Sequence, residues 1–107
     1  MIVKRGEVWL ATPDPRGGRT MPRTHPCVIV SPSEIHDYLR TVIVAPMTTA
    51  GEAAPFRIAL RVGGKRGLIL LDQICALDKA RLIRRVGTLG PATLRGALAA
   101  LQQTFAP

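Results

Sequence analysis

Two side chains suited to proton transfer and phosphate contact stand beside apolar segments of the chain. His25 precedes the apolar segment 27–31, and Thr48 follows Pro46 at the end of a second apolar segment, 41–45. A histidine takes or gives a proton near neutral pH, so His25 is a candidate general base or general acid. The hydroxyl of Thr48 can donate to a phosphate oxygen. Each also has a structural interpretation: a histidine that begins a strand, and a turn residue bonded to nearby backbone.

A cation for the same chemistry precedes His25. Arg23 lies two positions earlier, and in an extended segment residues two apart point to the same side, so its guanidinium is a candidate phosphate contact. Arg16 and Arg19, which are candidate RNA-binding residues, belong to the same Pro- and Gly-rich stretch, 12–26, which cannot hold a regular element. We predict a mobile basic loop there, and a loop of that length in a small domain is usually functional.

The charge balance points to a polyanionic partner. The 107 residues carry 15 Lys and Arg against 7 Asp and Glu, a formal net charge of +8, and 12 of the cations are Arg. Arg pairs bidentately with phosphate and stacks on bases, which favours nucleic acid. The alternative is a solvated basic surface without a partner.

Common catalytic motifs do not occur in the sequence. It has no phosphate-binding Gly loop, His-x-x-x-His pair, nucleophile elbow or cluster of metal ligands. An enzyme with this inventory needs a substrate that brings its own nucleophile, as RNA does with its 2′-hydroxyl. The remaining tasks are to orient that hydroxyl, move protons and stabilise charge on the phosphoryl oxygens.

Short strands must position these side chains. The predicted strands are alternating, β-branched or wholly apolar segments, and they are 7–11, 27–31, 41–45, 56–62, 68–71 and 82–89. The segment 68–71 is apolar on both faces and should be central, whereas 82–89 mixes apolar and basic residues like an edge strand. Between the second and third strands, Ser33 could cap one helical turn over 33–38, with His36 on the surface.

One convincing helix ends the chain. Pro91 opens it, and Leu94, Leu98, Leu101 and Phe105 form an apolar stripe that would pack on the sheet or on a partner subunit. Strands followed by a terminal helix predict a mainly β fold with α (α+β). We expect a small barrel of bent antiparallel sheet with one C-terminal helix on it.

Size, cysteines and hydropathy limit the cellular setting. A chain of 107 residues can bury one core, so we expect a single domain over 1–107 without disulfide or metal support. Cys27 and Cys75 lack disulfide or metal-site spacing and should behave as small apolar residues. We find no signal peptide and no apolar stretch of bilayer length. The expectation is a cytoplasmic protein with no membrane partner.

Several segments, in order and spacing, resemble the MazF/PemK toxins of bacterial toxin–antitoxin pairs. They are KRGEVW at 4–9, HPCVIVS at 25–31, VIVAPMTT at 42–49, LLDQI at 70–74, DKARL at 78–82 and LGP at 89–91. Each segment alone is a weak signal, whereas their joint order is hard to produce by chance. The resemblance covers nearly the whole chain.

This resemblance implies an SH3-like barrel that forms homodimers and cleaves single-stranded RNA at short sequences, with mRNA, tRNA and rRNA as possible substrates. Cleavage in this family uses no metal or other cofactor and leaves a 2′,3′-cyclic phosphate and a 5′-hydroxyl. An Arg directly before the proline of the second strand and a Thr after the proline of the third carry the chemistry. Thr48 matches the Thr, with Thr49 as its alternative. His25 stands where the family has the Arg.

The resemblance also implies partners and contacts outside the catalytic pair. Asp72 and Gln73 match an acid–amide pair on the RNA-binding face, where such groups read base edges; alternatively, Asp72 caps a turn. Arg81 matches a phosphate contact. An acidic cognate antitoxin is expected to fold a disordered tail along the basic surface and block RNA.

Two other functions fit the same residues. With His25 in place of the family's Arg, the fold could hold RNA or a partner without cutting it. The CcdB toxins, which poison DNA gyrase, have a similar fold. Thr48 and the basic loop favour RNA over gyrase.

Overall fold

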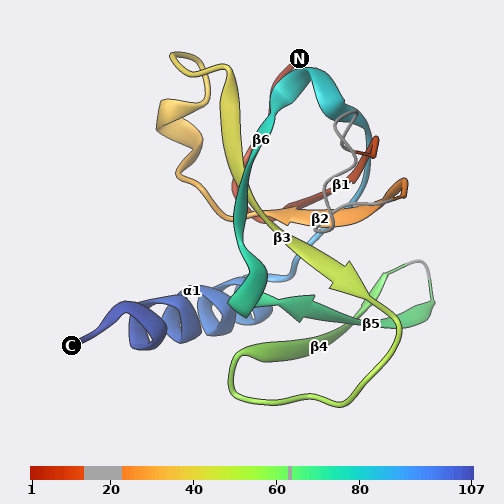
Figure 1. Cartoon of the computed structure of the whole chain (residues 1–107), viewed down its shortest axis with the longest axis vertical. Coiled ribbons are helices and arrows are strands. Elements are labelled where there is room, and N and C mark those ends of the chain that lie inside the picture. The colour runs from red at the N-terminus through yellow and green to blue at the C-terminus, as the bar shows by residue number, and fades with distance from the viewer. Residues whose placement is uncertain (14–22, 63) are drawn as a thin grey trace.

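The alternating and β-branched segments form the strands, and the segment that begins with Pro91 forms the helix (Figure 1). The computed structural model describes residues 1–13, 23–62 and 64–107; most of the predicted mobile loop, including Arg16 and Arg19, lies outside these ranges. The strands are β1 (Glu7–Ala11), β2 (His25–Ile29), β3 (Thr41–Thr48), β4 (Arg57–Val62), β5 (Lys65–Leu70), β6 (Cys75–Asp78) and β7 (Leu82–Thr88). The helices are α1 (Pro91–Phe105) and three short 3₁₀ turns, η1 (Ser33–Ile35), η2 (Leu71–Gln73) and η3 (Lys79–Arg81).

The described strands form a strongly curled antiparallel sheet, which confirms the predicted bent-sheet fold (Figure 1). Their order is β4-β5-β3-β2-β1-β7, and β6 pairs with β3. The predicted positions of two strands are also confirmed, because β5 lies between two neighbours and β7 lies at the edge. The long strand β3 connects both halves of the sheet: it pairs with β6 and β2 first, and its last two residues pair with β5.

The strand ends predicted at Pro26 and Pro46 are wrong, because both prolines lie inside strands. Pro26 pairs with β1, whereas the ladder between β2 and β3 begins at Cys27. Pro46 lies where β3 passes from β2 to β5. A missing backbone N–H is tolerated at such ladder ends. His25 and Thr48 are therefore terminal strand residues whose side chains have a defined face.

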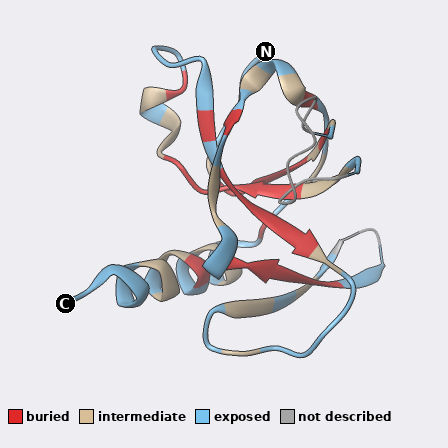
Figure 2. Ribbon diagram, in the orientation of Figure 1, coloured by how far each residue is buried: buried red, intermediate tan, exposed pale blue. Residues whose placement is uncertain are grey.

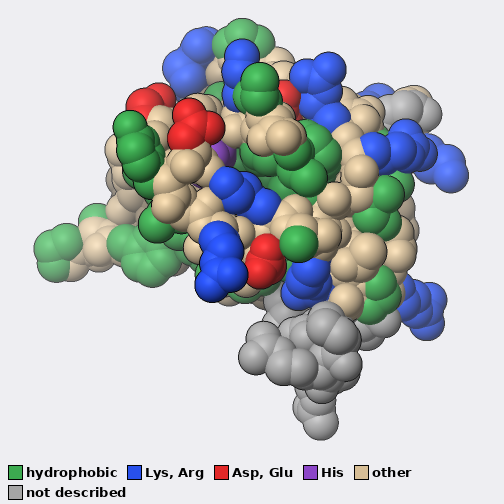
Figure 3. All heavy atoms as spheres, turned by 90° about the horizontal axis from the view of Figure 1, so that it is seen from above, with side chains coloured by type: hydrophobic (Ala, Val, Ile, Leu, Met, Phe, Trp, Pro, Cys, Tyr) green, Lys and Arg blue, Asp and Glu red, His purple; other side chains and the backbone are tan. Residues whose placement is uncertain are grey.

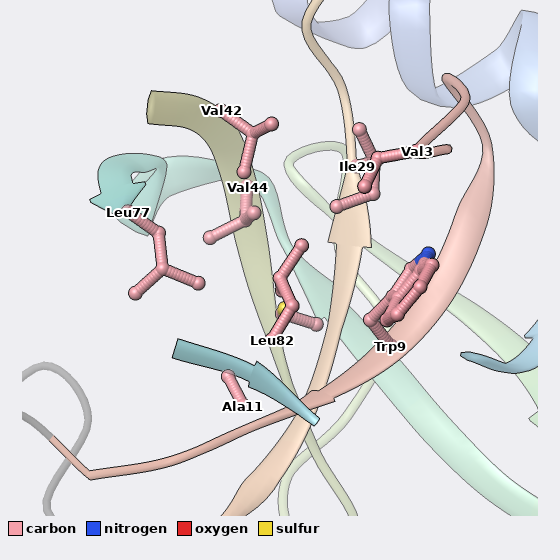
Figure 4. Packing of buried hydrophobic residues seen from close by; sticks show 9 residues of the cluster. Val3, Trp9, Ala11, Ile29, Val42, Val44, Leu77 and Leu82 are labelled. Carbon is pink, nitrogen blue, oxygen red and sulfur yellow. The ribbon is translucent and has the colours of Figure 1, made fainter. Parts of the chain in front are cut away.

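The two faces of the sheet bury two separate cores. The first core lies inside the curl (Figure 4) and consists of Val3, Trp9, Ala11, Cys27, Ile29, Val42, Val44, Leu77 and Leu82. The second core includes helix residue Ala97 and consists otherwise of Val8, Val28, Val30, Ala45, Met47, Ile69, Leu71 and Leu89. Buried residues concentrate on β1, β2, β3 and β5 (Figure 2). Because side chains alternate along a strand, Met47 faces the helix side and Thr48 faces the opposite side.

The helix α1 covers the second core. It begins at Pro91 as predicted, and Leu94 and Leu101 of the predicted stripe pack against buried sheet residues. Phe105, at the end of the stripe, remains 70% exposed. Among the described helices, none has both the length and the apolar character needed to cross a membrane.

The turn after β2 differs from its prediction. It is a short 3₁₀ turn, and Ser33 does not cap it; the Ser33 hydroxyl instead accepts from the backbone N–H of Arg5 at 2.8 Å. His36 is 3% exposed rather than on the surface. Its Nδ1 donates to the carbonyl of Val3 at 2.6 Å, and its Nε2 lies 2.7 Å from the hydroxyl of Ser31. These bonds fasten the N-terminal segment to the turn.

Candidate active site

His25, the first residue of β2, and Thr48, the last residue of β3, lie just beyond the last pair of the β2–β3 ladder. The last pair of the ladder between these strands is Cys27 with Pro46. His25 and Thr48 each lie two residues beyond that pair on their own strand, and so on the same face as Cys27 and Pro46. Directly opposite residues of an antiparallel pair point to the same face of the sheet. The two candidate catalytic side chains, far apart in the sequence, therefore share one face.

Two adjoining hollows open at this point. The larger, of about 510 Å³, is lined by Arg23, Thr24, His25, Pro26, Met47, Thr48, Thr49, Lys65, Arg66 and Gly67. The smaller, of about 260 Å³, is lined by Arg23, His25, Pro46, Met47, Thr48, Leu70 and Gln73. The structure thus gathers several predicted site residues around one opening, with the predicted catalytic residues shared by both hollows.

The ring of His25 has a defined orientation. Its Nδ1 lies 2.6 Å from the backbone carbonyl of Arg23, and because a carbonyl only accepts, Nδ1 carries the proton. The second ring nitrogen, Nε2, is buried and has no hydrogen-bond partner among the described residues. A buried polar atom without a partner is uncommon and calls for an explanation. The contacts therefore favour a neutral ring that presents a lone pair at Nε2.

The hydroxyl of Thr48 is also oriented by the backbone. Its Oγ1 accepts from the N–H of Ala50 at 3.2 Å, a bond across the turn that follows β3. This contact agrees with the interpretation of Thr48 as a turn residue bonded to nearby backbone. It uses only one lone pair of the hydroxyl oxygen. The hydroxyl proton stays available for a phosphate oxygen. Thr49, the alternative candidate, is exposed and lines the larger hollow.

Arg23 has two features that matter at this site. Its backbone carbonyl holds the ring of His25, and its exposed side chain lines both hollows. Arg23 and His25 therefore line the same two hollows, although Arg23 lies in a bend before β2 and not in the extended segment that was predicted. The other cations of the predicted basic loop, Arg16 and Arg19, lie outside the described residues.

The predicted acid–amide pair is split by the structure. Gln73 lines the smaller hollow, whereas Asp72 lines neither hollow and forms an ion pair with Arg57, with Nη2 and Oδ2 3.1 Å apart. Arg57 Nε also donates to the Asp72 carboxylate at 3.3 Å. The hydrogen bonds from Arg57 hold the pKa of Asp72 below its usual range. Asp72 is thus an exposed carboxylate whose charge is already paired.

Arg81 lies away from both hollows. Its Nη2 donates to the carbonyl of Thr12 at 2.7 Å, and its own carbonyl accepts from the backbone N–H of Thr12 at 2.9 Å. Arg81 therefore fastens the end of β1 to the start of β7. The described contacts give it an anchoring role beside the predicted phosphate contact.

Sequence reasoning missed Lys65 and Arg66, which line the larger hollow from β5. The available signal was a basic pair directly after a Gly-Gly turn. That signal does not indicate which other strand the pair faces. The link to Thr48 depends on the non-local pairing of β3 with β5, through Thr48 opposite Leu68.

The surroundings of the site are basic and offer no thiol nucleophile. Arg23, Lys65 and Arg66 line the larger hollow. Lys and Arg side chains are also spread over the face of the molecule seen in Figure 3, with a few Asp and Glu side chains between them. Burial raises the pKa of the Cys27 thiol to about 12, so this residue stays protonated at neutral pH. Within the described ranges, no three His, Cys, Asp or Glu side chains form a group that could hold a metal ion.

Comparison with known proteins gives concordant matches. Residues 4–105 match the family model described as PemK-like, MazF-like toxin of type II toxin–antitoxin system. The chain is 35% identical to the endoribonuclease PemK of Escherichia coli, over 74% of this chain and 64% of PemK. It is 33% identical to the endoribonuclease MazF of Staphylococcus epidermidis, over 76% of this chain and 72% of MazF. A mycobacterial endoribonuclease solved in complex with its cognate antitoxin superposes with a TM-score of 0.78 at 25% identity, covering 94% of this chain and 92% of that one.

Proposed function

Because the chain belongs to the PemK-like, MazF-like family of toxins of type II toxin–antitoxin systems, we propose that it is a sequence-specific endoribonuclease that cuts single-stranded RNA without a metal ion. The products would be a 2′,3′-cyclic phosphate and a 5′-hydroxyl. One observation carries this proposal: a hydroxyl donor, Thr48, and a lone-pair nitrogen, Nε2 of His25, share one face beside the same hollows. RNA supplies the nucleophile that the chain lacks.

The chemistry follows from these two groups. Nε2 of His25 accepts the proton of the ribose 2′-hydroxyl while the 2′-oxygen bonds to phosphorus. The bond from phosphorus to the 5′-oxygen breaks, and that oxygen takes a proton from water. The Thr48 hydroxyl donates to a non-bridging phosphoryl oxygen as negative charge grows there. Because Nε2 is covered in the free chain, RNA binding must shift the ring or its cover before proton transfer.

The test of this function is to map the ends of RNA fragments made by the purified protein in the presence of a chelator. The proposal predicts 5′-hydroxyl and 2′,3′-cyclic phosphate ends at a recurring short sequence. The matched control is Thr48→Val, which keeps the shape of the side chain and removes the hydroxyl; its fragments should be lost. Cleavage that needs a divalent metal, or that leaves 5′-phosphates, would overturn the mechanism.

A binding module is the second candidate, and the specific observation in its favour is His25 in place of the Arg expected at this position. Such a module would bind RNA in the basic surroundings of the hollow and leave it intact. RNA retained by the parent and recovered uncut would support this alternative. DNA breaks on induction, with bulk RNA intact, would instead indicate a gyrase poison.

We also propose that the chain works as a homodimer. The stripe on α1 is incompletely covered within one chain, since Leu98 and Leu101 line a hollow of about 350 Å³ and Phe105 is 70% exposed. A second copy of this chain would cover such an apolar face, and RNA would lie across the joint groove. Light scattering at micromolar concentration should give twice the monomer mass. A monomer under these conditions would contradict the proposal.

The proposed inhibitor is a small acidic antitoxin, which would act together with the chain in the cytoplasm. Its support is the net charge of +8 and the solved relative described as a complex with its cognate antitoxin. A disordered acidic tail would fold along the Arg-rich surface and exclude RNA. Co-expression of the adjacent reading frame should restore growth. A neighbouring product that is basic, or that fails to suppress toxicity, would refute this part.

A further inference from the structure

The proposed reaction needs a positive charge that the described contacts of His25 do not supply. Negative charge grows on the non-bridging phosphoryl oxygens during cleavage, and fixed cations stabilise it. His25 donates from Nδ1 to a carbonyl, and a second proton on the covered Nε2 would have no acceptor among the described residues. Among the described residues, the cations that line the larger hollow are Arg23, Lys65 and Arg66. The sheet register distinguishes the last two.

Strand alternation places Arg66 on the face of Thr48. Thr48 is directly opposite Leu68 in the pairing of β3 with β5, and Arg66 lies two residues before Leu68. Residues two apart on a strand point to the same side. Arg66 therefore shares the face of Thr48 and, through the register of β2 with β3, the face of His25.

The same alternation places Lys65 on the helix side. Lys65 lies two residues before Gly67 and four before Ile69, which belongs to the second core beneath α1. A Cβ added to Gly67 would lie 3.3 Å from Cε of Met47, another residue of that core. The side chain of Lys65 therefore starts on the face opposite to the Thr48 hydroxyl.

The guanidinium of Arg66 is held over the turn that follows Thr48. Its Nη1 lies 3.4 Å from the carbonyl of Gly51, and the preceding residue, Ala50, donates its backbone N–H to Thr48 Oγ1. One weak bond of this kind leaves the other N–H groups of the exposed side chain available to an anion. Thr48 and Arg66 are thus tied to the same turn.

Two further arginines on this face have other roles. Arg57 is opposite Leu70, and its charge is paired with Asp72. Arg61 is opposite Arg66 on β4, and its Nη1 donates to the carbonyl of Gly64 at the far end of the hairpin. Neither residue lines the hollows beside Thr48. Of these three, Arg66 is the arginine that combines the Thr48 face with the hollow.

We propose that Arg66 is a catalytic residue whose guanidinium contacts the non-bridging oxygens of the scissile phosphate, opposite His25. It supplies the permanent charge, and His25 is thereby left to act as the base. This assignment rests on the proposed function. It predicts that the contact is stronger in the transition state than in the ground state, so that Arg66 affects the rate more than RNA affinity.

The test compares Arg66→Ala with Arg61→Ala, a matched control on the same face. Single-turnover cleavage is measured on a short RNA that carries a site mapped with the parent. Affinity is measured on the same RNA with a 2′-deoxyribose at that site, which cannot be cut. Arg66→Ala should slow cleavage by about 10²- to 10³-fold and weaken affinity by less than about 10-fold, and added guanidinium should restore part of the rate. Arg61→Ala should stay within about 3-fold of the parent on both measures.

The other outcomes are decisive as well. If Arg66→Ala cleaves like the parent while Arg23→Ala is inactive, the charge belongs to Arg23 and the assignment is wrong. A loss of affinity without a loss of rate at saturation also overturns it. Should Arg66→Ala fail to fold, Arg66→Gln takes its place with the same expected loss. A parent that leaves no 5′-hydroxyl ends refutes the proposed function itself, and Arg66 as a catalytic residue with it.

Discussion

The two histidines of the chain make the same bond at one ring nitrogen and differ at the other. Nδ1 of His25 and Nδ1 of His36 each lie 2.6 Å from a backbone carbonyl, of Arg23 and Val3 respectively. Nε2 of His36 accepts from the hydroxyl of Ser31, which in turn accepts from the backbone N–H of Ile43. Nε2 of His25 has no partner among the described residues. A polar cluster in which every hydrogen-bonding group has a partner stabilises the fold. A cluster beside a hollow in which one group lacks a partner can receive a substrate.

The largest expected effect is on RNA cleavage by variants of His25 and Thr48. His25→Ala and Thr48→Val should each slow single-turnover cleavage by about 10²-fold or more, because a positioned base or donor is lost. Both should keep the unfolding midpoint of the parent. His25→Arg should be as slow as His25→Ala, since Arg cannot act as a base. Cleavage by His25→Ala at the parental rate would show that Nε2 of His25, which has no hydrogen-bond partner among the described residues, plays no catalytic role.

For His36, whose two ring nitrogens both have hydrogen-bond partners, we expect a loss of stability without a loss of cleavage rate. His36→Ala should lower the free energy of unfolding by about 2–4 kcal/mol, because it leaves buried partners unbonded and a cavity behind. Urea titration measures this loss, and Ser31→Ala should give part of it. The cleavage rate per folded molecule should stay within about 3-fold of the parent. A variant that stays stable but loses activity would break the distinction between the two histidines.

The buried carboxylate of Glu7 should make the stability of the fold depend on pH. Glu7 accepts from the N–H of Lys4 at 2.7 Å, from Trp9 Nε1 at 3.1 Å and from Arg85 Nη1 at 3.0 Å. Burial alone raises the pKa of Glu7, but these hydrogen bonds outweigh it and hold the pKa below its usual range. The resulting stabilisation is complete above the ordinary glutamate pKa of about 4.3. It is lost as the pH falls through the lower pKa of the folded state.

Glu7→Gln should therefore lose about 1–3 kcal/mol of unfolding free energy at pH 7. The difference between parent and variant should shrink as the pH falls below about 4. Urea titrations at several pH values measure this trend, and cleavage at pH 7 should be unaffected in the folded fraction. A difference that grows towards acid pH would mean that the bonds to Lys4, Trp9 and Arg85 do not favour the charged carboxylate.

The smallest effect on stability is expected at the exposed ion pair of Asp72 and Arg57. Asp72→Ala should change the free energy of unfolding by less than about 1 kcal/mol, because exposed ion pairs contribute little. If Asp72 reads a base, as its position in LLDQI predicts, the variant should change the distribution of cleavage sites and leave the rate at the best site unchanged. Sequencing of fragment ends measures both. An unaltered distribution would restrict base reading to Gln73 and its neighbours.

The fold was largely predictable because local patterns of apolar and polar residues determine most of its strands and its helix. Alternation at 7–11, the β-branched runs and the stripe after Pro91 agree with β1, β2, β3 and α1, since apolar periodicity decides which face is buried. The continuation of β2 and β3 through Pro26 and Pro46 was not predictable from local sequence. Their missing N–H groups are tolerated only because ladders between strands distant in sequence begin or change there.

The site was predictable only in part, for the same reason. His25 and Thr48 were found from residue type and family pattern, and both line the two hollows beyond the last pair of the β2–β3 ladder. Arg66 was missed because its relation to Thr48 arises from the pairing of β3 with β5. The burial of His36 depends on Ser31 and Val3, which reach it from two different segments. Contacts between segments distant in sequence thus determine which polar side chains have all their hydrogen-bond partners.

The most direct test of His25 as the base is the pH dependence of single-turnover RNA cleavage in the presence of a chelator. With the lone pair at Nε2 as acceptor, the rate should rise from acid pH and then level off, because a protonated ring has no lone pair to accept the 2′-hydroxyl proton. The same rise should be absent from the residual activity of His25→Ala. A rate that falls as the pH rises would contradict the mechanism, because it would mean that a protonated His25 acts as the cation on the phosphate.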